Sequence, residues 1–176
     1  MLELKENYRL AGTVNGTTSA EGIQAILDKL GEAEVYGNID SSKVILDIGS
    51  GDGSALNELK TRSGVTRAIG VEFIESRHDE AVANYPECEF HLAAIQEKLD
   101  LVAEADIIFT NDICFPKEVF WSYWSSIKVG AAVVYNKISN SVKLIHHYDY
   151  DRREDFNKLT VEANNMLSEF HIIIKK

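Results

Sequence analysis

Short apolar runs alternate with amphipathic stretches through the middle of the chain. The β-branched run at residues 44–48 is followed by the glycine-rich sequence GSGDGS and then by helical spacing over residues 55–60. The same order recurs along the chain, with strands predicted at 67–72, 88–92, 105–110 and 131–135 and helices at 76–85 and 117–127. Strands that alternate with helices form βαβ units, so the pattern predicts a parallel sheet covered by helices on both faces.

The two ends of the chain follow different patterns. Residues 19–30 predict a capped amphipathic helix whose apolar stripe consists of Ile23, Ile26, Leu27 and Leu30. Near the C-terminus, residues 158–163 and 169–175 flank the stretch 164–167, which begins with two asparagines. Asparagine tolerates the left-handed geometry of tight turns, so we predict a C-terminal antiparallel hairpin. The whole pattern indicates an α/β fold with a doubly wound, mostly parallel sheet.

The length and composition of the chain indicate one acidic domain. The chain has 176 residues, a formal net charge of −10 and 45% hydrophobic residues, which suffices for a substantial core. Ten excess negative charges repel phosphate backbones, so we expect no strong binding to bare nucleic acid and a better fit to a basic protein.

Targeting and metal signals are weak. The N-terminal sequence MLELKENYRL contains no apolar stretch, so we expect neither a signal peptide nor a membrane anchor, and an intracellular location. Cys88 and Cys114 have neither a CxxC partner nor zinc-like spacing. We therefore predict no disulfide and no metal site.

The glycine-rich turn is the first candidate for chemistry. The segment 47–53, Asp-Ile-Gly-Ser-Gly-Asp-Gly, lies where a predicted strand ends and a helix begins. A dinucleotide fingerprint reads GxGxxG, whereas here the third glycine comes one residue early and Ser54 takes its place. Asp47 would repel a diphosphate but attract a cationic amino group. Together with Glu72 at the end of the next strand, which would accept the ribose hydroxyls, the arrangement resembles the class I S-adenosylmethionine (SAM) methyltransferases.

Three segments, in order, resemble a more specific family, the non-SET histone lysine methyltransferases named for disruptor of telomeric silencing. Residues 14–19 are similar to that family's VYGETS loop, and residues 44–53 to its VDLGSGVG strand and turn. The third match begins with residues 108–115, which are similar to IFVNNFAF, and continues with residues 128–134, which are similar to the KEGGRIVSSK strand. The resemblance covers roughly residues 8 to 138 and implies a seven-stranded Rossmann-like methyltransferase sheet.

The resemblance also implies roles for individual residues. It assigns cofactor binding to the covering loop, the glycine turn, the end of the second strand and the positions beside the adenine: Thr13, Gly16, Thr17, Thr18, Asp47, Gly49, Ser50, Gly51, Gly53, Glu72, Phe73, Ala94 and Asn111. It places Asn111 also at the mouth of the substrate channel, with Phe115 and Phe170 lining it. Ala94 stands where the family has an Asp-Phe step that reads the adenine amino group.

The resulting hypothesis is a SAM-dependent protein lysine N-methyltransferase that acts on a histone in the nucleosome. It implies a nuclear, monomeric, single domain over residues 1–176, with a covering segment at 1–42, a SAM-binding core at 43–138 and a substrate-side segment at 139–176. Placement of the two reactants supplies most of the acceleration in such a transfer, so no catalytic base is expected. Two alternatives stay open: a cytoplasmic small-molecule SAM methyltransferase, and a catalytically weak SAM-binding module, which Ala94 suggests.

Overall fold

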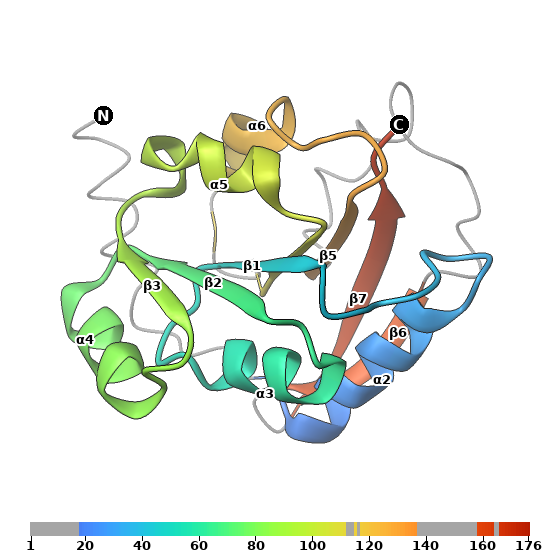
Figure 1. Ribbon diagram of the computed structural model, residues 1–176, viewed down its shortest axis with the longest axis horizontal. Coiled ribbons are helices and arrows are strands. Elements are labelled where there is room, and N and C mark those ends of the chain that lie inside the picture. The colour runs from blue at the N-terminus through green and yellow to red at the C-terminus, as the bar shows by residue number, and fades with distance from the viewer. Residues whose placement is uncertain (1–17, 112–114, 116, 137–157, 164–165) are drawn as a thin grey trace.

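The computed structural model describes residues 18–111, 115, 117–136, 158–163 and 166–176. Helices and strands alternate along most of this part of the chain (Figure 1). In chain order the elements are α2 (Ala20–Gly31), β1 (Val44–Ile48), α3 (Ser54–Ser63), β2 (Arg67–Glu72), α4 (Glu75–Asn84), β3 (Glu89–Leu92), η1 (Ile95–Glu97), α5 (Leu99–Glu104), β4 (Ile107–Thr110), α6 (Lys117–Trp124), β5 (Ala132–Asn136), β6 (Lys158–Ala163) and β7 (Met166–Ile174).

All seven strands form one sheet in the order β3-β2-β1-β4-β5-β7-β6. Strands β1 to β5 pair in parallel, and β7 runs antiparallel to both β5 and β6. The predicted doubly wound, mostly parallel sheet with a C-terminal antiparallel hairpin is therefore confirmed. Strand β7 begins at Met166, earlier than the predicted start at Glu169, because its pairing with β6 continues almost to the turn.

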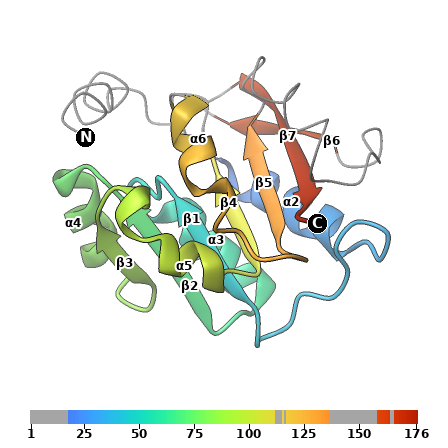
Figure 2. The same ribbon diagram turned by 90° about the horizontal axis from the view of Figure 1, so that it is seen from above.

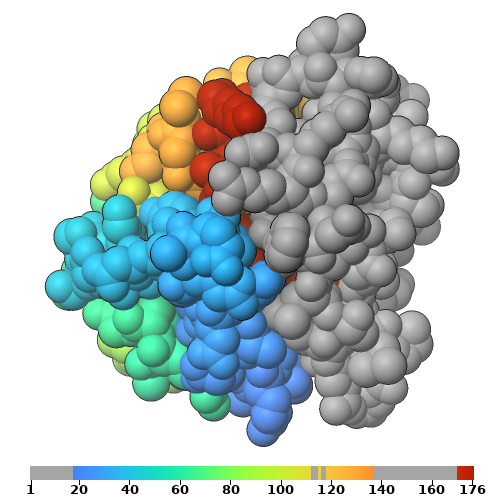
Figure 3. Space-filling model, turned by 90° about the vertical axis from the view of Figure 1, so that its right-hand side faces the viewer, coloured from blue at the N-terminus to red at the C-terminus, as the bar shows by residue number. Residues whose placement is uncertain are grey.

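Helices cover both faces of the sheet. Helices α5 and α6 lie on one face, and α2, α3 and α4 on the other (Figures 1 and 2). The predicted stripe of α2 is buried against this second face, and the Ser19 hydroxyl caps the helix by accepting a hydrogen bond of 3.1 Å from the Gly22 N–H. Figure 3 shows the outer surface of α2 and of the segment that follows it. Among the described helices, none has the length and apolarity that a membrane span requires.

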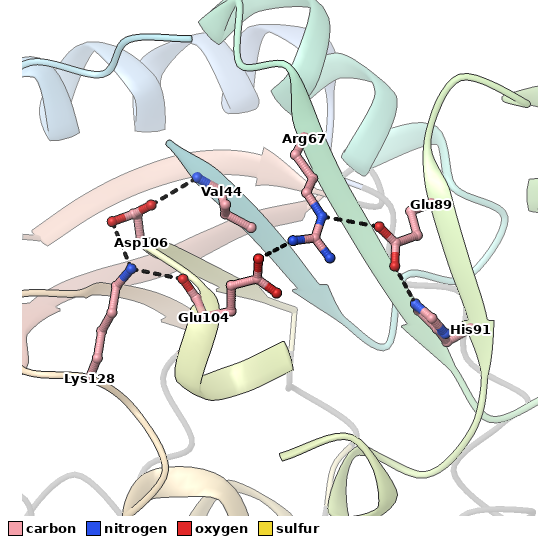
Figure 4. A network of polar contacts seen from close by, with 7 residues as sticks. All are labelled: Val44, Arg67, Glu89, His91, Glu104, Asp106 and Lys128. Atoms are coloured by element: carbon pink, nitrogen blue, oxygen red, sulfur yellow. Dashed lines mark hydrogen bonds and ion pairs between the residues drawn. The ribbon is translucent and has the colours of Figure 1, made fainter. Parts of the chain in front are cut away.

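Charged side chains connect the strands near their amino ends, which we call the amino edge (Figure 4). Asp106 accepts hydrogen bonds of 2.9 Å from the Val44 N–H and from Lys128 Nζ. Arg67 donates to Glu89 over 3.1 Å and also to Glu104. Burial alone would raise the pKa of Asp106, but the bonds from Lys128 and Val44 outweigh it and hold that pKa below its usual range.

Candidate functional site

The opposite ends of the parallel strands, which we call the carboxyl edge, carry the glycine-rich turn. After β1 the chain bends sharply, because the N–H groups of Gly49 and Ser50 both donate to the Val71 carbonyl, over 2.8 and 3.2 Å. Gly51 has a φ of +55° and open space where a side chain would begin. At Gly49, in contrast, a side chain would collide with the ring of Phe115. The turn therefore presents bare backbone at Gly51, where a ligand can approach closely.

Glu72 ends β2 beside this turn and is only 5% exposed. Its carboxylate accepts three backbone hydrogen bonds: from Gly51 over 2.9 Å, from Phe73 over 2.8 Å and from Ile74 over 2.7 Å. These bonds fix the carboxylate between the turn and the start of α4. A carboxylate has about four acceptor positions, so Glu72 can still accept from hydroxyl groups of a ligand.

Asp47 lies on β1, next to Glu72 and 2% exposed. Burial, reinforced by the negative charges of Glu72 and Asp52, raises the pKa of Asp47 to about 8. A cationic group beside Asp47 would reverse this effect, because it would favour the carboxylate. The chemistry of this position therefore suits a ligand with a positive charge.

Two asparagines meet at the ends of β4 and β5. Asn136 Nδ2 donates a hydrogen bond to Asn111 Oδ1, and the Thr110 hydroxyl donates to the Ile48 carbonyl over 3.2 Å. Asn136 is 2% exposed, and no described residue donates to its Oδ1. Asn136 is not among the site residues predicted from the sequence. A polar residue that ends an otherwise apolar strand, next to the strand end at Asn111, is the signal that could have identified it.

The structure brings most of the sequence-predicted residues to the carboxyl edge. Hydrogen bonds link the glycine turn, Glu72 and Phe73, and Phe115 covers Gly49. Asp47 is close enough to Glu72 for the two charges to interact. Ala94 precedes η1 just after β3, where its N–H donates to Glu97 over 3.2 Å. The hydroxyl oxygens of Thr18 and Ser50 are buried and, among the described residues, have no hydrogen-bond partner.

One described residue among those predicted, Phe170, does not join this group in the structure. Phe170 is fully buried under α2 and stacks on Phe109 with ring centroids 5.7 Å apart. Its role in lining a substrate channel stays a prediction. Three more predicted residues, Thr13, Gly16 and Thr17, lie outside the described residues, so their assignment to a covering loop also stays a prediction.

Comparisons with known proteins place the fold. No family model and no curated protein matches the chain in sequence. Among solved structures, the precorrin-6Y C5,15-methyltransferase of Geobacter metallireducens is 18% identical, with a TM-score of 0.66 over 89% of this chain and 88% of that one. An RNA methyltransferase of Salinibacter ruber, in complex with S-adenosyl-L-homocysteine (SAH), is 19% identical, with a TM-score of 0.60 over 87% and 92%.

TrmN of Thermus thermophilus is 17% identical, with a TM-score of 0.68 over 89% of this chain but only 49% of its own. Identities this low define the fold alone. The chain has the Rossmann-like fold of class I methyltransferases.

These neighbours correct the specific family resemblance. They are bacterial methyltransferases, two of them named for a precorrin and for RNA, and not histone methyltransferases. The expected membership in the disruptor of telomeric silencing family is therefore wrong, and so is the expected histone or nucleosome partner. The physical reason is that a glycine turn and polar strand ends belong to the carboxyl edge of this fold in general and do not identify a substrate. The nuclear location, which rested on the histone, loses its basis.

Proposed function

We propose that the protein is a SAM-dependent methyltransferase that acts on a small molecule. One observation carries the proposal: Asp47 and Glu72 are buried near each other at the carboxyl edge, and Glu72 accepts a hydrogen bond from the open backbone of Gly51. Strand β1 lies between β2 and β4. From β1 the sheet is extended on one side by β2 and β3 and on the other by β4 and β5, so the strand order reverses at β1. In open α/β sheets, ligands bind in the crevice at such a switch point.

The residues present fit SAM part by part. Asp47 would face the cationic amino-acid end, Gly51 would allow the backbone to approach the cofactor, and Glu72 would accept from the ribose hydroxyls. SAM supplies a methyl group activated on a sulfonium. The chain's own contribution is to hold the two reactants in line and to exclude water. Since Ala94 has no polar side-chain atom, we expect backbone groups after β3 to read the adenine.

The substrate class follows from charge. Two classes are represented among the structural neighbours, a small molecule and RNA. A protein with a net charge of −10 repels a polyanion, so its own surface favours the small molecule. The amide pair of Asn111 and Asn136 lies at the ends of β4 and β5, beside the proposed cofactor site, and offers hydrogen-bonding groups for such an acceptor.

Calorimetric titration with SAH tests the cofactor site. Gly51→Leu places a side chain where the cofactor would approach, whereas Gly64→Leu is a matched control at the end of α3. Both glycines have positive φ, +55° and +73°, and open space for a side chain, so both substitutions should strain the backbone alike. We expect SAH to bind the wild type and Gly64→Leu, and Gly51→Leu to bind at least about tenfold more weakly. No binding to the wild type, or equal weakening in both variants, would overturn the proposal.

Methyl transfer distinguishes the substrate classes. The wild-type protein is incubated with methyl-labelled SAM and either a metabolite extract or total tRNA. We expect label in the metabolite fraction. Label in the tRNA alone would show that the proposed substrate class is wrong while the methyltransferase activity is right.

A further inference from the structure

Asp47 lies in a setting that disfavours its negative charge. Its side chain is 2% exposed and comes from β1, in the centre of the sheet. The charged groups that act on it are Glu72, at the end of β2, and Asp52, in the glycine-rich turn, and both are negative. The structure thus places two buried carboxyl groups, Asp47 and Glu72, beside the half-buried carboxyl group of Asp52.

The other two carboxylates are already stabilised by hydrogen bonds. Glu72 accepts from three backbone N–H groups, and Asp52 accepts from the Ser54 N–H over 3.0 Å and from the Ser54 hydroxyl over 2.6 Å. No hydrogen bond from the described part of the chain reaches the Asp47 carboxyl. Ionisation of Asp47 is therefore costly, because its carboxylate would be buried without a hydrogen-bond donor from the described residues.

We propose that Asp47 is uncharged in the cofactor-free protein and releases its proton to solvent when the ammonium group of the cofactor's amino-acid end arrives beside it. This inference rests on the proposed function. The step makes and breaks no other bond: the proton passes to water or buffer, and the carboxylate and ammonium then form an ion pair. The pKa of Asp47, raised to about 8 by burial and by its acidic neighbours, agrees with this geometry.

Two consequences follow from the direction of proton movement. Because binding releases a proton, the affinity for the cofactor should rise by about tenfold per pH unit while the pH stays below the pKa of Asp47. A ligand without the ammonium should show no such rise. Asp47 therefore discriminates between cationic and neutral ligands of the same site.

Proton release is measured by titrating SAH calorimetrically in buffers of different ionisation enthalpy near neutral pH. We expect the wild type to release close to one proton per SAH. 5′-Methylthioadenosine, which keeps the nucleoside and the thioether but lacks the amino-acid end, should release none. Asp47→Asn should abolish the release with SAH. Asp28→Asn, at an exposed carboxyl on α2, is the matched carboxyl-to-amide control, and it should retain the release.

The outcomes separate this inference from the proposed function. If SAH binds the wild type without releasing a proton, or if Asp47→Asn still releases one, the inference is wrong and the cofactor site stands. If SAH does not bind at all, both fail.

A measurement without ligand checks the proton on Asp47 separately. The unfolded chain loses this proton near its ordinary pKa, so the free energy of unfolding of the wild type should fall, relative to Asp47→Asn, as the pH rises from about 4 to about 8. Parallel curves for the two proteins would show that Asp47 is already ionised, and would overturn the inference.

Discussion

The two edges of the sheet use polar residues in opposite ways. At the amino edge, Arg67 lies between Glu89 and Glu104, and all three side chains are partly exposed. At the carboxyl edge, Asp47 and Asn136 are buried and keep hydrogen-bonding atoms that no described residue satisfies. Charges that find partners and water stabilise the fold. Buried polar atoms without partners reduce stability, and such groups persist in proteins where a ligand completes them.

The largest expected effect comes from removing the most extensively bonded group of the carboxyl edge. Glu72→Ala leaves the N–H groups of Gly51, Phe73 and Ile74 without their acceptor, which we expect to lower the free energy of unfolding by roughly 3–5 kcal/mol. Glu72→Gln retains an acceptor oxygen and should lose less. Urea titration of both variants measures the difference, and equal losses would show that the backbone bonds to Glu72 contribute little.

A glycine pair separates steric conflict from backbone strain. A side chain at Gly53 would lie 2.8 Å from the Phe90 ring and 3.0 Å from Ala81, whereas Gly64 has open space, and both have positive φ. Gly53→Ala should therefore cost roughly 2–4 kcal/mol and Gly64→Ala about 1–2 kcal/mol. The comparison is made by thermal unfolding. Equal costs would mean that α4 can move away from the turn without penalty.

Substitution of Asn136 is expected to raise the free energy of unfolding, unlike the substitutions above. Asn136→Leu removes a buried oxygen that has no donor among the described residues, so we expect it to stabilise the cofactor-free protein by about 1–2 kcal/mol. Chemical denaturation measures this gain. A loss of stability instead would show that Asn136 is held by its bond to Asn111 for structural reasons.

The amino edge should tolerate mutation best. Arg67→Ala breaks the ion pairs with Glu89 and Glu104, whose side chains are 39% and 45% exposed, so water and salt already screen them. We expect a loss of at most about 1 kcal/mol, which should shrink further in concentrated salt. A larger loss of stability that does not depend on salt would show that these ion pairs contribute substantially to the stability of the sheet.

Strong local patterns made most of the fold predictable. The mostly apolar runs of β1 and β2 and the apolar stripe of α2 predicted these three elements with the observed bounds or nearly so. Helix α5 was missed because six residues are too few to show a helical period. The short helix η1, which begins just after Ala94, was not predicted either, because its sequence contains no glycine, proline or asparagine to indicate a turn.

The candidate site could be predicted where its residues are close to one another in the sequence. The glycine turn and Asp47 form one segment, and Glu72 ends the next strand. Asn136 could not be found in this way, because its contact with Asn111 depends on β4 and β5 being neighbours. The histone substrate was wrong for a related reason: similar strand ends and turns serve many substrates on this fold.

Amide chemical shifts during a titration with SAH would locate the cofactor site residue by residue. If the carboxyl edge is a cofactor site, the largest shifts should fall on Gly49, Gly51 and Gly53, and on Phe73 and Ile74. The amide signals of Arg67, Glu89 and Lys128, at the amino edge, should not shift. We expect saturable shifts that are confined to the carboxyl edge. No shifts, or shifts centred on the amino edge, would contradict the proposed cofactor site.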